Sequence, residues 1–214
     1  MTDIHAAAVL LDMDGTLVDS HAVVERLWTQ WSLAHGIDPA TTLSIIHGRQ
    51  GQESMALLLP ARPREDNLAE NRALLEAETA ELDGVVALDG ASELLDALAH
   101  LPHALVTSAP LALATARMGA ARLRMPDTAV TAEDVSASKP HPEGFLAAAR
   151  ILGVDAADCV VLEDSANGIQ AGLAAGMRVI GVGPHAAEAH PTWVVDSPAG
   201  VSARAGGTGI RLTL

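Results

Sequence analysis

Residues 6–16, Ala-Ala-Ala-Val-Leu-Leu-Asp-Met-Asp-Gly-Thr, join a continuous apolar run to an acidic turn. A short apolar run of this kind predicts a strand, here over residues 6–11, that is buried on both faces as in a parallel sheet. Because side chains alternate along an extended chain, Asp12 and Asp14 share one face at the end of that strand. Two carboxylates held together there repel each other unless a cation lies between them. The stretch therefore predicts a divalent metal site, with an exposed acidic turn as the alternative interpretation.

Three more short apolar runs follow along the chain, and each ends in polar residues or a turn. The runs at 104–106, 159–162 and 179–182 lead into Thr107-Ser108, Glu163-Asp164 and Gly183-Pro184. Stretches typical of helices lie between them, at 91–99, 111–123, 142–152 and 167–175. Strands that alternate with helices of about 10–15 residues are typical of a parallel α/β sheet. Ligands bind outside the carboxyl ends of the strands in such sheets, so we expect these polar residues to converge on one site.

Residues 18–84 interrupt this alternation and favour helices throughout, at 22–35, 42–47, 53–59 and 65–82. A helical insert of this length fits a cap over the ligand edge of the sheet. We therefore predict the α/β class, with a Rossmann-like doubly wound parallel sheet over residues 1–17 and 85–214 and an inserted α-helical cap domain over 18–84. Trp28 and Trp31, one helical turn apart, are expected in the core of the cap. Residues 199–214 favour an edge hairpin.

Composition and charge exclude several other classes of protein. The chain has 214 residues, of which 49% are apolar, so it is not an intrinsically disordered protein. Its 13 basic and 27 acidic side chains give a formal net charge of −14, which would repel the phosphates of a nucleic acid. Only 2% of the residues are aromatic, so there are few side chains on which bases could stack, and a nucleic-acid partner is not expected. The longest uncharged stretch, between Asp96 and Arg117, contains two prolines, so no membrane segment is expected. The N-terminus has no basic residue before Arg26, which makes the cytoplasm the expected location.

Three polar groups outside the first strand have the chemistry of a phosphate site. Lys139 is the only lysine among 13 basic residues, and its compact ammonium suits phosphate oxygens, with a chance surface lysine as the alternative. Thr107 and Ser108 offer hydroxyls and backbone N–H groups just before an expected helix. Glu163 and Asp164 are hard oxygen ligands that suit Mg²⁺, although a helix N-cap explains Asp164 equally well.

These motifs occur in the order Asp-x-Asp-Gly-Thr, Thr-Ser, Lys-Pro and Glu-Asp, each at a strand end or beside one. With these motifs, the chain from residue 8 to residue 183 resembles the haloacid dehalogenase superfamily, in its phosphatase branch with a helical (C1-type) cap. The resemblance implies hydrolysis of a small-molecule partner, a sugar or polyol phosphate, through an aspartyl-phosphate. It implies that Asp12 is the nucleophile and that Asp14 is first the general acid and then the general base.

The resemblance also implies roles for the other polar residues. The phosphoryl oxygens would be bound by four catalytic and binding residues, namely Asp12, Thr107, Ser108 and Lys139. The cofactor would be Mg²⁺, held by the Asp12 carboxylate, the Asp14 backbone carbonyl and Asp164, with Glu163 assisting directly or through water. The sequence leaves open whether the protein is a monomer or a small homo-oligomer.

Residues 47–53, His-Gly-Arg-Gln-Gly-Gln-Glu, connect two expected cap helices and resemble the corresponding stretch of sugar-phosphate and glycerol-phosphate phosphatases. Four polar side chains of this loop are candidate contacts to substrate hydroxyls: His47, Arg49, Gln50 and Glu53. A solvated connection between two helices is the alternative interpretation.

Two other functions compete with phosphate ester hydrolysis. The chain also resembles beta-phosphoglucomutase, in which a cap histidine, arginine and lysine handle the sugar phosphate. The matching histidine and arginine positions hold Val24 and Gly51 here, and the cap has no lysine, so hydrolysis is favoured over a mutase reaction. A non-catalytic phosphate-binding protein of the same fold is the second alternative. It is disfavoured because every required catalytic position is filled.

Overall fold

The computed structural model describes residues 2–207 and 209–214, and the strands within those ranges form three sheets. The main sheet has six parallel strands in the order β6-β5-β2-β7-β8-β9. They are β2 (Ala8–Leu11), β5 (His103–Val106), β6 (Ala129–Val130), β7 (Cys159–Glu163), β8 (Arg178–Val182) and β9 (Trp193–Val195). The strand β2, which comes first of the six in the sequence, lies inside the sheet, and the later strands are added on both sides of it. This doubly wound arrangement confirms the predicted α/β class.

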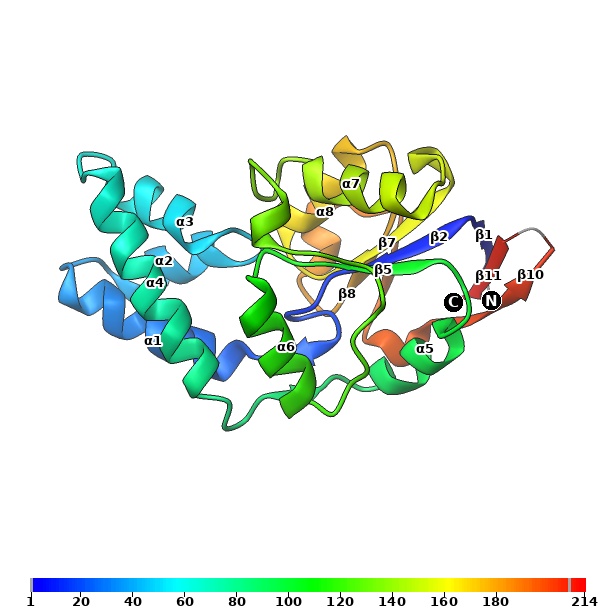
Figure 1. Ribbon diagram of the computed structural model, residues 1–214, viewed down its shortest axis with the longest axis horizontal. Coiled ribbons are helices and arrows are strands. Elements are labelled where there is room, and N and C mark those ends of the chain that lie inside the picture. The colour runs from blue at the N-terminus through cyan, green and yellow to red at the C-terminus, as the bar shows by residue number, and fades with distance from the viewer. Residues whose placement is uncertain (1, 208) are drawn as a thin grey trace.

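Helices cover both faces of the main sheet (Figure 1). The covering helices are α5 (Ala91–Leu98) and α6 (Leu111–Ala120) on one face, and α7 (Glu143–Leu152) and α8 (Ala166–Ala174) on the other. Side chains of β2 alternate between the two faces, with Val9 and Leu11 in one buried cluster and Ala8 and Leu10 in the other. Because neither face meets water, β2 has no polar residue until it ends.

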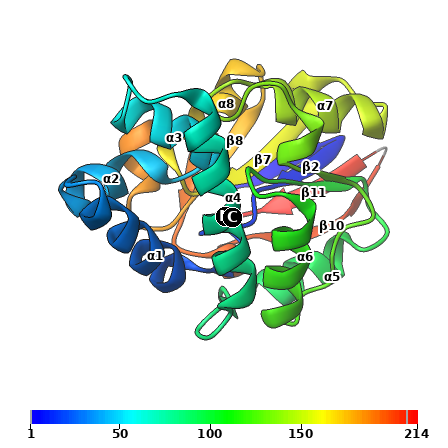
Figure 2. The same ribbon diagram turned by 60° about the vertical axis from the view of Figure 1, so that its left-hand side comes forward.

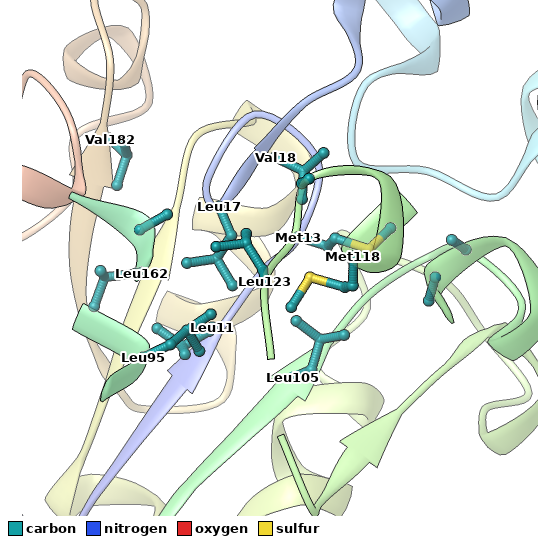
Figure 3. Close-up of a cluster of buried hydrophobic side chains, with 14 of the residues drawn as sticks. Leu11, Met13, Leu17, Val18, Leu95, Leu105, Met118, Leu123, Leu162 and Val182 are labelled. Carbon is teal, nitrogen blue, oxygen red and sulfur yellow. The ribbon is translucent and has the colours of Figure 1, made fainter. Parts of the chain in front are cut away.

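The acidic turn after β2 is anchored by its own apolar residues. Met13 and Leu17 are fully buried, and they belong to the same cluster as Leu11 of β2 and Leu105 of β5 (Figure 3). Met13 lies between two aspartates in the sequence, so its burial directs the flanking carboxylates away from the hydrophobic cluster. The core packing therefore decides where the acidic side chains emerge.

Four helices make up the inserted segment: α1 (His21–Ala34), α2 (Pro39–Ile46), α3 (Gly51–Leu58) and α4 (Arg64–Ala80). They lie together at the end of the molecule opposite the two chain termini (Figure 1), and Figure 2 turns these helices toward the viewer. The two linkers to this segment pair with each other as antiparallel strands, β3 (Val18–Asp19) and β4 (Val86–Ala87). The division into a core (1–17 and 85–214) and a cap (18–84) stays a prediction, and we use these two names below.

The tryptophans of α1 are buried as expected. Trp28 is 4% exposed and Trp31 is 8% exposed, and their rings meet edge to face with centroids 5.4 Å apart. The indole N–H of Trp31 donates to Glu70 Oε2 of α4 at 2.7 Å, so the pair joins two cap helices.

Of the two strand predictions near the chain ends, the one for residues 6–11 is wrong in part and the one for the C-terminal hairpin agrees with the structure. Residues 6–11 do not form one strand, because β1 (Asp3–Ala6) pairs with β11 (Gly209–Thr213) in a separate antiparallel sheet. The alternation of exposed and buried residues along β1 is typical of a half-buried strand, and the apolar run concealed the change of sheet. The expected hairpin does form, from β10 (Ser202–Gly206) and β11. It lies in the sheet β1-β11-β10, where β10 is an edge strand, and Ile210 and Leu212 of β11 are buried in the core cluster.

The other expected strands and helices are confirmed, with ends that agree to within three residues. The strands β6 and β9 and the linker pair were not expected from the sequence, since each has only two or three residues. Within residues 2–207 and 209–214, no helix combines the length and the apolar character that crossing a membrane requires.

Candidate active site

A cavity of about 100 Å³ lies between the cap and the carboxyl ends of the main strands. Its core wall includes residues that follow three adjacent strands of the sheet: Asp12 and Asp14 after β2, Thr107 and Ser108 after β5, and Asp164 after β7. The cap wall includes His47 and Arg49. Seven residues predicted from the sequence therefore line one cavity, and the five that follow strands meet there because the strands are parallel.

Lys139 lies in the loop before α7, and its ammonium contacts groups from three adjacent strands. It donates to the Asp12 carboxylate, to Glu163 Oε1 at 2.7 Å and to the carbonyl oxygen of Val106 at 3.1 Å. The ring of Phe145 lies 5.2 Å from Nζ, which is a favourable distance for a cation–π contact. An ammonium has three protons, and each has an acceptor here. The lone lysine of the chain is thus a fully paired, buried cation and not a surface residue.

Burial and unbalanced negative charge dominate the electrostatics around this ammonium. Burial raises the pKa of Asp12 to about 8, with Glu163 adding to the rise and Lys139 opposing it. Burial also raises the pKa of Asp164 well above its ordinary value, and the charges of Glu163 and Asp12 raise it further. Burial alone would lower the pKa of Lys139, but the charges of Asp12 and Glu163 outweigh it and raise that pKa.

The acidic cluster has a donor set that fits Mg²⁺. One oxygen from each of Asp12, Glu163 and Asp164 lies within 4.8 Å of the others. With all three carboxylates ionised, the ammonium leaves a formal charge of −2 in this site, and burial of that charge is why the pKa values of Asp12 and Asp164 are raised; a divalent cation would balance it. Carboxylate oxygens are the ligands that Mg²⁺ prefers. Gly15 makes this approach possible, since it has a φ of +82° and a Cβ there would lie 2.1 Å from Asp164 Oδ2.

Glu163 is held more tightly than the other two carboxylates. Its Oε1 accepts from Lys139, and its Oε2 accepts from the backbone N–H of Ser165 at 2.7 Å and from the Ser165 hydroxyl at 3.0 Å. Helix α8 comes so close that a Cβ on Gly168 would lie 1.5 Å from Glu163 Oε1. Both carboxylate oxygens are therefore engaged, which favours Glu163 as the anchor of Lys139 over a direct metal ligand.

Asp14 has partners that differ from those of Asp12. Its Oδ1 accepts from the Ser20 hydroxyl at 2.7 Å, and its Oδ2 accepts from Arg117 Nη1 at 2.8 Å. The other arm of this guanidinium, Nη2, donates to Glu78 Oε2 of α4 at 2.7 Å. The sequence analysis missed Arg117 and Glu78. A signal was present for the arginine, because it shares the buried face of α6 with Leu113 and Met118 at helical spacing.

The hydroxyls after β5 have protein partners of their own. Thr107 Oγ1 accepts from the backbone N–H of Ala109 at 3.1 Å, which makes a tight turn before α6. The Ser108 hydroxyl donates to the carbonyl oxygen of Gly48 in the cap at 2.8 Å. Both residues face the cavity, and Ser108 also joins the core to the cap.

The cap loop divides its polar residues between the cavity and the core. His47 and Arg49 line the cavity, and Arg49 Nη2 donates to Asn167 Oδ1 of α8 at 2.9 Å. Burial lowers the pKa of His47, with the charge of His21 adding to the effect. The loop is thus bonded to the core, which argues against a merely solvated connection between helices.

Two of the four predicted cap contacts are directed elsewhere. Gln50 and Glu53 do not line the cavity: the Gln50 side chain donates to the carbonyl oxygen of Ala132 at 3.2 Å, and Glu53 accepts from the backbone N–H of Ser138 at 3.2 Å. The physical reason is that α3 begins at Gly51, and its first turn lies against the loop that carries Ser138 and Lys139. These two side chains therefore brace the cap against the core, Glu53 at the lysine loop and Gln50 at Ala132.

The family of this protein follows from the match of its sequence to a protein-family model. Residues 6–176 match the model of the haloacid dehalogenase-like hydrolases. The chain belongs to this family. Hexitol phosphatase A of Escherichia coli (strain K12) is 43% identical to this hydrolase over 175 residues, which is 81% of each chain. Glycerol-1-phosphate phosphohydrolase 1 of Saccharomyces cerevisiae is 30% identical over 188 residues, 82% of this chain and 74% of the yeast protein.

A solved structure confirms the fold of the hydrolase across both parts of the chain. Beta-phosphoglucomutase from Clostridium difficile superposes with a TM-score of 0.80, at 22% identity, over 91% of this chain and 92% of that one. At this level of identity the match establishes the architecture, with its α/β core and helical insert, and says nothing about the reaction.

Replacement of Gly168 by alanine is expected to destabilise the hydrolase. The new Cβ would overlap Glu163 Oε1, so the buried glutamate has to move, and we expect a loss of about 1–3 kcal/mol in the free energy of unfolding. The matched control is Gly119→Ala in α6, where a Cβ meets nothing within 4 Å. Alanine favours a helix over glycine, so the control is expected to be neutral or to stabilise by up to about 1 kcal/mol. Urea unfolding of both variants checks this, and equal effects would contradict the close approach at Glu163.

Proposed function

We propose that this hydrolase is a Mg²⁺-dependent phosphatase that cleaves a small phosphomonoester, a sugar or polyol phosphate, through an aspartyl-phosphate. The observation that carries the proposal is the buried Lys139 ammonium against Asp12, with Asp14 facing the same cavity. Burial raises the pKa of Asp12 to about 8, and the paired ammonium opposes that rise and so favours the ionised form that a nucleophile needs.

The reaction divides between two aspartates. A carboxylate oxygen of Asp12 attacks phosphorus, a P–O bond forms, and the bond from phosphorus to the leaving alcohol oxygen breaks. Asp14 gives its proton to that oxygen, so the product leaves as a neutral alcohol. Asp14, now a carboxylate, takes a proton from the water that attacks the aspartyl-phosphate, and this step releases phosphate and restores both side chains.

Three further residues are proposed to bind the phosphoryl group: Thr107, Ser108 and Lys139. The first two line the cavity beside Asp12 and can donate hydroxyl or backbone N–H groups to oxygens of the ester. The ammonium contributes a fixed positive charge where negative charge accumulates, which is the main way in which a protein favours phosphoryl transfer.

The metal is proposed to be bound by the Asp12 carboxylate, the Asp14 backbone carbonyl and Asp164, with Glu163 behind them as the anchor of Lys139. A bound Mg²⁺ neutralises charge between an anionic nucleophile and an anionic ester. The residues of this chain supply the remaining functions: Lys139 orients the nucleophile Asp12, Asp14 is the acid, and Thr107 and Ser108 bind the phosphoryl group.

The cap side of the cavity supports a substrate with several hydroxyl groups. Among the residues that the structure describes, three buried polar atoms that lack a hydrogen-bond partner belong to residues lining this cavity: Arg49 Nε, Asn71 Oδ1 and Arg117 Nε. The side chains of Arg49, Asn71 and Arg117 give the cavity wall the polar groups that a ligand with several hydroxyl groups requires. Relatives that are named for hexitol and glycerol-1-phosphate hydrolysis support the same substrate class.

The mutase alternative receives less support from the cap. Val24 and Gly51, at the two positions compared above, both line the cavity and offer no charged group to a second phosphate. A Cβ at Gly51 would lie 2.1 Å from Asn71 Oδ1, so the packing leaves no room for a larger side chain there. A bisphosphate intermediate would therefore have no second cationic anchor at these positions, and hydrolysis is the better supported reaction.

Replacement of Asp12 by asparagine is expected to abolish turnover while the fold is kept. The amide is a poor nucleophile, and we expect kcat on small phosphomonoesters to fall at least about a thousandfold. Asp19→Asn, on the half-exposed linker strand β3, is the matched control and should leave kcat unchanged. Phosphate release by the two variants and the wild type, with circular dichroism for the fold, makes the test. Equal rates in Asp12→Asn and the wild type would support the non-catalytic alternative.

Removal of divalent metal is expected to suppress activity at least about a hundredfold, because the carboxylate cluster then repels the phosphate dianion. Phosphate release is measured after dialysis against a chelator and again after addition of Mg²⁺. Activity should return with Mg²⁺ and not with a sodium salt at the same ionic strength. Full turnover in excess chelator would contradict the role given to Asp164.

Arg49→Ala is expected to impair polyol and sugar phosphates more than an aryl phosphate. Loss of one charged hydrogen bond to a substrate hydroxyl corresponds to a fall of about 10–100-fold in kcat/KM for the polyol ester. The aryl phosphate has no such hydroxyl and should change by less than about threefold on the same grounds. Arg64→Ala, exposed at the start of α4, is the control. Equal losses on both esters would remove the cap loop from substrate recognition.

A further inference from the structure

A buried ion network joins the cap to Asp14 across the cavity. The Arg117 guanidinium donates to Asp14 Oδ2 at 2.8 Å and to Glu78 Oε2 at 2.7 Å. The side chains of Arg117 and Glu78 are only 4% and 7% exposed. Their helices, α6 of the core and α4 of the cap, lie side by side (Figure 2).

This network occupies a place where an apolar side chain would otherwise pack. Arg117 lies on the buried face of α6 with Leu113, Ala114 and Met118. Replacing a buried ion pair by apolar residues of similar volume is often neutral or stabilising, so the network is weak evidence for a contribution to stability. Arg117 also bonds to Asp14, and this second contact, rather than the ion pair with Glu78, points to a functional role for the arginine.

Asp14 is held from two directions. Ser20, just before α1, donates to Oδ1, and Arg117 donates to Oδ2. Each carboxylate oxygen accepts about two hydrogen bonds, so both keep one acceptor position for the reacting groups. The two donors come from separate elements of the chain, and together they fix the rotation of the carboxyl group. Glu78 in turn holds the second arm of the guanidinium, so the arginine itself does not move freely.

We propose that Arg117 is a positioning residue that orients the Asp14 carboxyl group toward the leaving oxygen, with Glu78 as its buried counter-ion. This inference rests on the proposed function, in which Asp14 donates the proton. A positioned acid matters only when the leaving group needs a proton. An alkyl alcohol leaves poorly as an alkoxide and depends on Asp14, whereas p-nitrophenol leaves as a stable phenolate and does not.

The test compares kcat/KM on two classes of ester, because this constant reports the steps through departure of the leaving group. The alkyl esters are sorbitol 6-phosphate and glycerol 1-phosphate, and the aryl ester is p-nitrophenyl phosphate. The main variant is the double substitution Arg117→Met/Glu78→Leu, which removes both charges and leaves no buried ion unpaired. We expect kcat/KM to fall about 10–100-fold on the alkyl esters and less than about threefold on the aryl ester.

Two single variants and a control complete the design. Arg117→Met alone leaves Glu78 buried without a counter-ion, so we expect a lower Tm, which the double variant restores. Arg117→Lys keeps the charge but has no second arm, so we expect a smaller loss on the alkyl esters only. Glu81→Gln is the matched control, since it breaks the Arg26–Glu81 pair, in which both side chains are 45% exposed. It should leave both constants and the Tm unchanged.

The outcomes separate the inference from the proposed function. If the wild type hydrolyses both classes and the double variant loses both equally, or loses neither, Arg117 does not position the acid and the inference is overturned. If the wild type hydrolyses no phosphomonoester, the proposed function itself fails, and the inference fails with it. A loss confined to the alkyl esters, with partial recovery in Arg117→Lys, supports it.

Discussion

The pairing of one buried ammonium with the ends of three adjacent strands is the constraint on which the rest of the site depends. Lys139 donates to Asp12, Glu163 and the backbone of Val106, and these acceptors come from β2, β7 and β5. An unpaired charge at such depth is prohibitively costly, so the loop that carries the lysine has little freedom. Glu163 is held in turn by Ser165, and the Gly168 backbone leaves it the space it needs. The nucleophile candidate is therefore oriented by a chain of buried contacts that begins in the sheet.

Charge is distributed so that two aspartates two residues apart have different surroundings. Asp12 is nearly buried and shares Lys139 with the acidic cluster, whereas the side chain of Asp14 is 30% exposed and shares Arg117 with Glu78. Met13 lies between them and is locked into the hydrophobic cluster, so neither carboxylate can take the place of the other. Different environments for neighbouring acids are the usual way in which one site supports two distinct proton and bonding roles.

The cap contributes to the site from two sides. Residues 47–53 bond to Ser108, Ser138 and Asn167 of the core, and the last helix of the cap reaches Arg117. The cavity lies between these two sets of contacts. Ser138 precedes Lys139, so the same loop of the core receives the cap and carries the central cation. These contacts therefore join the cap wall of the cavity to its core wall.

The amino-acid sequence by itself determined the parallel α/β core, the helical insert and the polar residues at the strand ends. These features have local signals: apolar runs, helical spacing and an acidic turn, each within a few residues. Only the tertiary structure decided which side of the cap loop faces the cavity, so that Gln50 and Glu53 bond to Ala132 and Ser138 of the core while Arg49 lines the cavity. It alone brought Arg117 to Asp14 and Glu78, which are 103 and 39 residues away in the chain. Contacts of this kind arise from the packing of separate helices against a sheet, and local spacing in a sequence carries no record of that packing.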